Sequence, residues 1–175
     1  MTSRRTFLAG LALAPLAAAL PRRAAAASRS FPRVPARSLA REDVTLPSAF
    51  AGSRNLVLLA PHRSETEQLD SWIAPLAALQ ADVPELADYR LTLMGTVSDA
   101  HRGLVEGALR GLVKEPSAWP RFLLHYGERE AVLAELGARS EAPMALLLDA
   151  SGDELWRASG VWSEATDASL RSALG

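Results

Sequence analysis

The sequence predicts an α/β domain in which a central mixed sheet carries helices on both faces and ends in a β-hairpin followed by a helix. Two purely apolar runs, Leu56–Ala60 and Met144–Leu148, are bounded by turn-forming residues, as strands buried on both faces are. Helical patterns alternate with strand patterns between these runs, which is typical of a mostly parallel sheet. The turn Ala150–Asp153 joins Met144–Leu148 to Glu154–Ala158 and predicts the hairpin.

The first 27 residues have the features of a twin-arginine export signal. Arg4 and Arg5 precede an apolar run, Phe7–Leu20, that is shorter than the roughly twenty residues needed to span a bilayer. Ala24–Ala27 then supplies small residues for a signal peptidase. We expect residues 1–27 to direct export of the folded domain to the periplasm or another extracytoplasmic space. A general secretion signal or an uncleaved anchor is the alternative.

Composition excludes several classes of function. The chain has 19 basic and 20 acidic residues, and its first 27 residues contain four arginines and no acid, so the remainder has a net charge of about −5. No basic patch indicates a nucleic acid partner. The chain has no cysteine. This excludes a cysteine nucleophile, a thiol redox couple, an iron–sulfur cluster and a thiolate zinc site.

The beginning of the mature chain divides into a leader and a domain. Residues 28–40 are rich in Arg, Ser and Pro and predict an exposed leader. The domain is expected over residues 41–175, with a short strand at Val44–Leu46 that Pro47 ends. After Gly52 and a turn comes the buried strand Leu56–Ala60.

A helix is expected to follow this buried strand. Ser64 and Glu67 have the spacing of a capping box, and Pro75 predicts a kink or break. The next helix carries its apolar stripe on Leu104, Val105, Ala108, Leu109 and Leu112. Further strands are expected at 89–97 and 121–126, and further helices at 128–136 and 163–174.

The segment Glu141–Asp149, followed by Gly152 and Gly160, resembles the C-terminal half of thioredoxin-like proteins. The opening from Val44 through Pro47 resembles the peroxiredoxin-like branch of that superfamily. The resemblance implies that Pro143 is cis and that it faces the loop at His62, where relatives hold extended peptide. The alternative is a trans proline that heads a strand.

A cysteine-free chain with Trp72 early in the first helix resembles the mitochondrial ATP-synthase assembly-factor family and its bacterial relatives. That resemblance implies a redox-inactive protein that binds another protein, such as a member of a membrane complex, and requires no cofactor. We expect no transmembrane segment in the mature chain.

The loop at 61–67 is where thioredoxin-like relatives place their redox cysteine. The predicted binding groove comprises His62, Arg63, Ser64 and Glu67, facing Pro143. The start of a helix and an arginine could instead hold a small anionic ligand. An ordinary polar loop at a capped helix start gives the same pattern.

Neither catalysis nor metal binding finds support in the sequence. A Ser64–His62 pair lacks an orienting third group and a nucleophile elbow, so we assign no catalytic residue. His62, His101 and His125 lack metal-site spacing and are expected at the surface. Trp119, in an irregular segment, is the best candidate for an exposed aromatic anchor.

Overall fold

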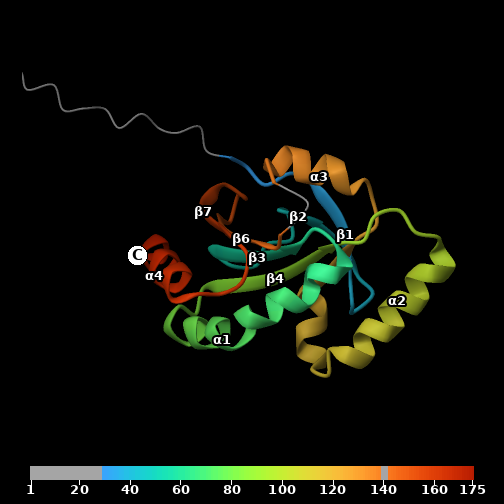
Figure 1. Ribbon diagram of the computed structural model, residues 1–175, viewed down its shortest axis with the longest axis horizontal. Helices are drawn as coiled ribbons and strands as arrows, with labels where there is room; N and C mark the ends of the chain where they lie inside the picture. The colour runs from blue at the N-terminus through green and yellow to red at the C-terminus, as the bar shows by residue number, and fades with distance from the viewer. Residues whose placement is uncertain (1–28, 139–141) are drawn as a thin grey trace, which may run out of the picture.

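The computed structural model describes residues 29–138 and 142–175 and confirms the predicted α/β architecture (Figure 1). One mixed sheet of seven strands has the order β2-β1-β5-β4-β3-β6-β7. The trio β5-β4-β3 is parallel, and the other neighbouring pairs are antiparallel. The expected export signal, residues 1–27, lies outside the described residues.

The strands are β1 (Val34–Ser38), β2 (Asp43–Leu46), β3 (Arg54–Ala60), β4 (Leu86–Leu93), β5 (Phe122–His125), β6 (Met144–Asp149) and β7 (Glu154–Ser159).

Helices cover both faces of the sheet. The helices are η1 (Arg63–Trp72), α1 (Ile73–Asp82), α2 (Asp99–Leu112), η2 (Pro116–Arg121), α3 (Arg129–Leu136) and α4 (Glu164–Leu174), where η denotes a 3-10 helix. α3 packs on one face, against a cluster that includes Val57 and Leu91. On the other face, η1, α1 and α4 cover Leu56 and Leu58, and α2 and η2 cover Phe122.

β3 is the central buried strand that its apolar run predicts. Every residue from Leu56 to Ala60 is 0 % exposed. Because side chains alternate along a strand, Leu56 and Leu58 join the cluster under η1, whereas Val57 and Leu59 join the cluster under α3. A strand with a helix on each face needs no polar side chain, and this explains the unbroken run.

The segment expected to be an exposed leader is partly a strand, so the boundary at residue 40 is wrong. β1 pairs with β2 and β5, and Leu39, which follows it, is fully buried. Successive N–H groups along a strand point alternately to its two neighbours. The Ser38 N–H bonds to the Glu42 carbonyl on the β2 side, so the nitrogen of Pro35, three residues earlier, points toward β5, where no partner is needed. The β1–β5 ladder covers only Arg37 and Ser38, so the missing N–H at Pro35 leaves no carbonyl of β5 unpaired.

The first helix begins differently from the capping box expected at Ser64. His62 is the N-cap, and the Ser64 hydroxyl donates to Glu65 Oε1 (2.9 Å) instead of capping the helix. The first turns are 3-10, opening with a hydrogen bond from the Glu65 N–H to the His62 carbonyl. The change to α-helix comes at Ile73. Pro75 therefore lies in the first turn of α1, where N–H groups have no partner within the helix.

Candidate functional site

The loop expected to form the site leaves the carboxyl end of β3 and is tied to α3. Arg129 Nη1 lies 2.7 Å from His62 Nδ1, although the two residues are 67 positions apart. A guanidinium can only donate, so His62 Nδ1 accepts this hydrogen bond and Nε2 carries the ring hydrogen. The contact fixes the orientation of the imidazole at the end of β3.

Arg129 is held in turn by a carboxylate. Its Nε and Nη2 donate to Glu130 Oε1 at 3.1 and 2.7 Å. The hydrogen bond from Arg129 lowers the pKa of Glu130 below its usual range. The result is a chain of three side chains, Glu130–Arg129–His62, that closes one side of the loop. Arg129 and Glu130 could not be predicted from the sequence, because no local pattern links the start of α3 to the end of β3.

The rest of the loop is more acidic than basic. Arg63 is exposed and makes no ion pair within the described residues. Glu65, Glu67 and Asp70 follow it within two turns. Glu65 Oε2 is buried without a hydrogen-bond partner in the described part of the chain. Three carboxylates around one free guanidinium disfavour a small anion as the ligand.

Pro143 lies next to the loop, but the implied cis bond is wrong. Leu59 pairs with Met144, which places Pro143 beside Ala60 at the end of β3. The cis X–Pro bond in the described residues is Leu46–Pro47, and Pro143 is trans. A trans proline suits the start of β6, and the Pro143 carbonyl accepts from the Gly160 N–H (2.8 Å). The role of Pro143 in binding stays a prediction.

A cleft of about 540 Å³ opens on the other side of η1, over β4. Its apolar lining includes Ile73, Leu109 and Phe122, and among the predicted site residues it includes Glu67. η1 and α1 border it on one side and α2 and η2 on the other. The cleft therefore lies between the two groups of helices that cover this face of the sheet, η1 with α1 and α2 with η2. The full lining is Thr66, Glu67, Asp70, Ile73, Arg90, Leu109, Leu112, Val113, Lys114, Glu115, Ala118 and Phe122.

Charges of both signs surround the apolar lining of this cleft. Glu67, Asp70 and Glu115 are acidic, and Arg90 and Lys114 are basic. None of the five forms an ion pair with a described residue. The cleft therefore has an apolar centre and a charged rim, and no ion pair within the described residues neutralises that rim.

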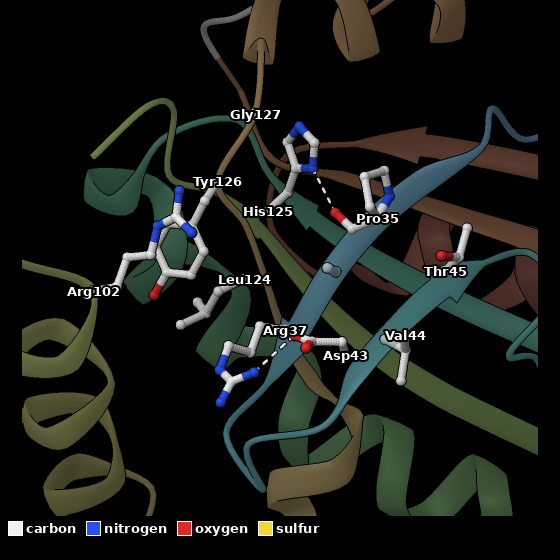
Figure 2. Close-up of a pocket in the computed structure, with 11 residues that line it drawn as sticks. Pro35, Arg37, Asp43, Val44, Thr45, Arg102, Leu124, His125, Tyr126 and Gly127 are labelled. Carbon is white, nitrogen blue, oxygen red and sulfur yellow. Dashed lines mark hydrogen bonds and ion pairs between the residues drawn. The ribbon is translucent and has the colours of Figure 1, made fainter. Parts of the chain in front are cut away.

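A second cavity, of about 350 Å³, lies beside β1 (Figure 2). His125 is 5 % exposed there, so its expected place at the surface is wrong. Its Nδ1 donates to the Pro35 carbonyl (2.7 Å), where β1 and β5 no longer pair. On the α2 side of the cavity, the Arg102 guanidinium lies 4.9 Å from the centre of the Tyr126 ring. His125 thus supports the open end of the ladder, a structural role.

Trp119 is not the exposed anchor that its irregular segment suggested. It lies in η2, is half-buried against the cluster around Phe122, and donates from Nε1 to the Val113 carbonyl (2.9 Å). The hydrogen bond satisfies the only polar atom of the indole, and the ring covers the end of α2. Trp119 therefore acts mainly in packing.

No group of three or more metal-ligating side chains comes together among residues 29–138 and 142–175. His101, the third histidine, is exposed and bonds through Nδ1 to the Ser98 hydroxyl (2.8 Å). Within the same ranges, no helix has both the length and the apolar character needed to cross a membrane.

No family model matches the sequence, and no curated protein is similar enough to count as a relative. Solved structures do match its fold. The thioredoxin domain of a thiol-disulfide oxidoreductase from Bacteroides vulgatus is 14% identical, with a TM-score of 0.55, covering 85% of this chain and 99% of that one. The exposed lipoprotein thioredoxin of Streptococcus pneumoniae is 12% identical, with a TM-score of 0.54, covering 82% and 98%.

A third similar structure is BsSco, a member of the Sco family of cytochrome c oxidase assembly proteins. It is 12% identical, with a TM-score of 0.55, and the match covers 84% of this chain and 94% of that one. At these identities the likeness concerns the fold. The chain thus has a thioredoxin-like fold, and because it has no cysteine it is not a thiol redox enzyme.

Proposed function

We propose that this protein is an exported, redox-inactive binding module that holds a segment of another protein beside the former redox loop and so assists assembly of a complex. The observation that carries the proposal is the 540 Å³ cleft next to that loop, with its apolar lining and unpaired charged rim. The occupant we infer is a polypeptide segment with an apolar side chain for the cleft and charged flanks of both signs.

Charge favours a polypeptide over a small anion. A protein segment can place a base near Glu67 or Asp70 and an acid near Lys114, whereas a small anion can satisfy only one sign. Ile73 is 40 % exposed at the mouth of the cleft and would lose contact with water when a segment binds. Arg63 would reach the same segment from the loop.

The assembly role is supported by analogy. BsSco, with the same fold, belongs to a family of assembly proteins for a membrane enzyme, and the cysteine-free sequence resembles the ATP-synthase assembly factors. The export signal inferred for residues 1–27 would place the protein outside the cytoplasm, where it could meet a membrane complex. A fold hosts many functions, so the partner must be identified by experiment.

Site-specific photo-crosslinking in the native host tests the proposal. A photoreactive residue at Ile73 should give a discrete adduct, and the same residue at the exposed Ala134, on α3 across the sheet, should not. Glu67→Arg should reduce the Ile73 adduct because it reverses a charge on the rim. The matched control, Glu135→Arg on α3, should leave the adduct unchanged.

Equal labelling from Ile73 and Ala134, or an adduct that Glu67→Arg does not affect, would exclude the cleft as the binding surface. The small-anion alternative has its own measurement. Phosphate should leave the thermal midpoint unchanged beyond its general salt effect, whereas a ligand well above its dissociation constant raises it. A phosphate-specific rise that Arg63→Ala abolishes would favour the alternative.

A further inference from the structure

α2 directs an apolar stripe toward solvent. Residues on this outward face recur at intervals of three and four, the spacing with which a helix normally faces a core. Leu104 is 72 % exposed and Leu112 is 71 % exposed. The outward face is exposed and carries no carboxylate, guanidinium or ammonium group, and it consists of Ala100, His101, Gly103, Leu104, Gly107, Ala108, Gly111 and Leu112.

The charged residues in the middle of α2 point into the domain. Glu106 is 5 % exposed and accepts from the Tyr126 hydroxyl (3.5 Å). Arg110 Nη1 donates to the Leu39 carbonyl (3.1 Å), and Arg102 lies over the Tyr126 ring. The usual arrangement of a surface helix is therefore partly reversed, because Glu106 and Arg110 point inward beside the buried Leu109, and the outward face has no carboxylate or guanidinium to keep it in water.

Three glycines leave part of this outward face without side chains. A Cβ built on Gly103, Gly107 or Gly111 would meet no atom within 4 Å. Each glycine inside a helix costs about 0.5–1 kcal/mol relative to alanine, and no close approach within the chain explains the three. A second helix can come close to such a surface, because backbone replaces side chains at the point of contact.

The outward face of α2 is complementary to the same face of a second α2 that runs antiparallel to it. It has the order Gly-Leu, Gly-Ala, Gly-Leu at positions 103–104, 107–108 and 111–112. An antiparallel copy centred at Ala108 therefore places Leu104 against the second copy's Leu112. The antiparallel arrangement also sets the two helix dipoles in opposite directions.

We propose that α2 pairs antiparallel with α2 of a second copy of this chain about a two-fold axis. The surface is isologous, as a closed dimer requires. A helix of 14 residues is about 21 Å long, and one such pair buries less than the roughly 800 Å² per partner of a standard stable interface. The dimer is accordingly weak and depends on protein concentration. It does not rest on the proposed function.

Sedimentation equilibrium between about 1 µM and 1 mM, a range that spans weak association, tests the pairing. The wild-type mass should rise toward twice that of the monomer. Ala108→Glu should keep the protein monomeric, because it buries a charge at the centre of the pair. The control Ala78→Glu, on the exposed face of α1, should dimerise like the wild type. Circular dichroism of each variant checks that the fold is intact.

Paired charges test the antiparallel direction. Leu104→Glu and Leu112→Lys should each weaken the dimer, and the double variant should restore it, because the antiparallel pair sets position 104 against position 112 of the second copy. A parallel pair places like residues together, so the double variant would restore nothing, and this would overturn the proposed direction. A wild-type chain that stays monomeric throughout, or a dimer that Ala108→Glu leaves intact, would overturn the interface.

Discussion

The two groups of helices on the same face of the sheet differ in the contacts that hold them. Under η1, α1 and α4, Trp72 is fully buried and its ring lies 4.9 Å from that of Trp162. Under α2, charged groups share the contact with the buried Leu109, because Glu106 is buried as well and Arg110 bonds to a backbone carbonyl. The difference teaches that charged residues can help to attach a helix to a core, which leaves some of its apolar residues available for a partner.

The sharpest test of the apolar side is Trp72→Ala. Deleting a fully buried indole leaves a cavity and orphans the Gly160 carbonyl that accepts from Nε1 (3.2 Å). We expect a loss of about 3–5 kcal/mol in the free energy of unfolding, measured in urea. Trp162→Ala, at a half-buried ring of the same cluster, should cost less. Equal losses would show that the cluster does not depend on its buried member.

The corresponding test of the polar side is Arg110→Met, which keeps most of the side-chain stem and removes the hydrogen bond to Leu39. The carbonyl belongs to a fully buried residue, so we expect a loss of about 1–3 kcal/mol in urea unfolding. Arg171→Met, at an exposed ion-pair network with Asp82 and Asp167, is the control and should change stability less. An unchanged midpoint for Arg110→Met would mean that charge does not anchor α2.

The smallest effect is expected from Tyr126→Phe at high pH. Burial, and secondly the nearby Glu106 carboxylate, raise the pKa of Tyr126 to about 12, above its value of about 10 in an unfolded chain. The folded state therefore holds this proton longer. The resulting stability is present below about pH 10 and is lost as the pH rises toward 12. Urea midpoints should fall less steeply over this range in Tyr126→Phe, and an unaltered slope would exclude the tyrosine as the cause.

The difference between the two groups of helices also explains which parts of the fold could be predicted from the sequence. Leu56–Ala60 and Met144–Leu148 predicted the central strands because residues buried on both faces must all be apolar. α2 was predicted as a helix, but of its expected apolar stripe only Val105 and Leu109 pack inward, whereas Leu104, Ala108 and Leu112 face outward. It has apolar stripes on both sides, and only tertiary partners such as Tyr126 and Leu39 decide which one is covered.

The limits at β1 and at the site have a similar cause. β1 contains Pro35 and Arg37, which disguise a strand, and its place in the sheet depends on β5, far along the chain. The loop after β3 was located from the order of elements alone. Arg129 and the cleft were missed because they arise where separate elements meet, and spacing along one segment carries no information about that.

The tryptophan cluster has a practical consequence for experiments on this protein. Three of its four tryptophans are grouped, with ring centroids 4.9 Å apart for Trp72–Trp162 and 6.5 Å for Trp72–Trp156. Rings fixed at this distance and crossing angle couple optically and give a near-ultraviolet circular dichroism signal. This signal is lost when the packing loosens, even if the secondary structure persists. The intrinsic tryptophan signal can therefore be used to follow tertiary packing without a label.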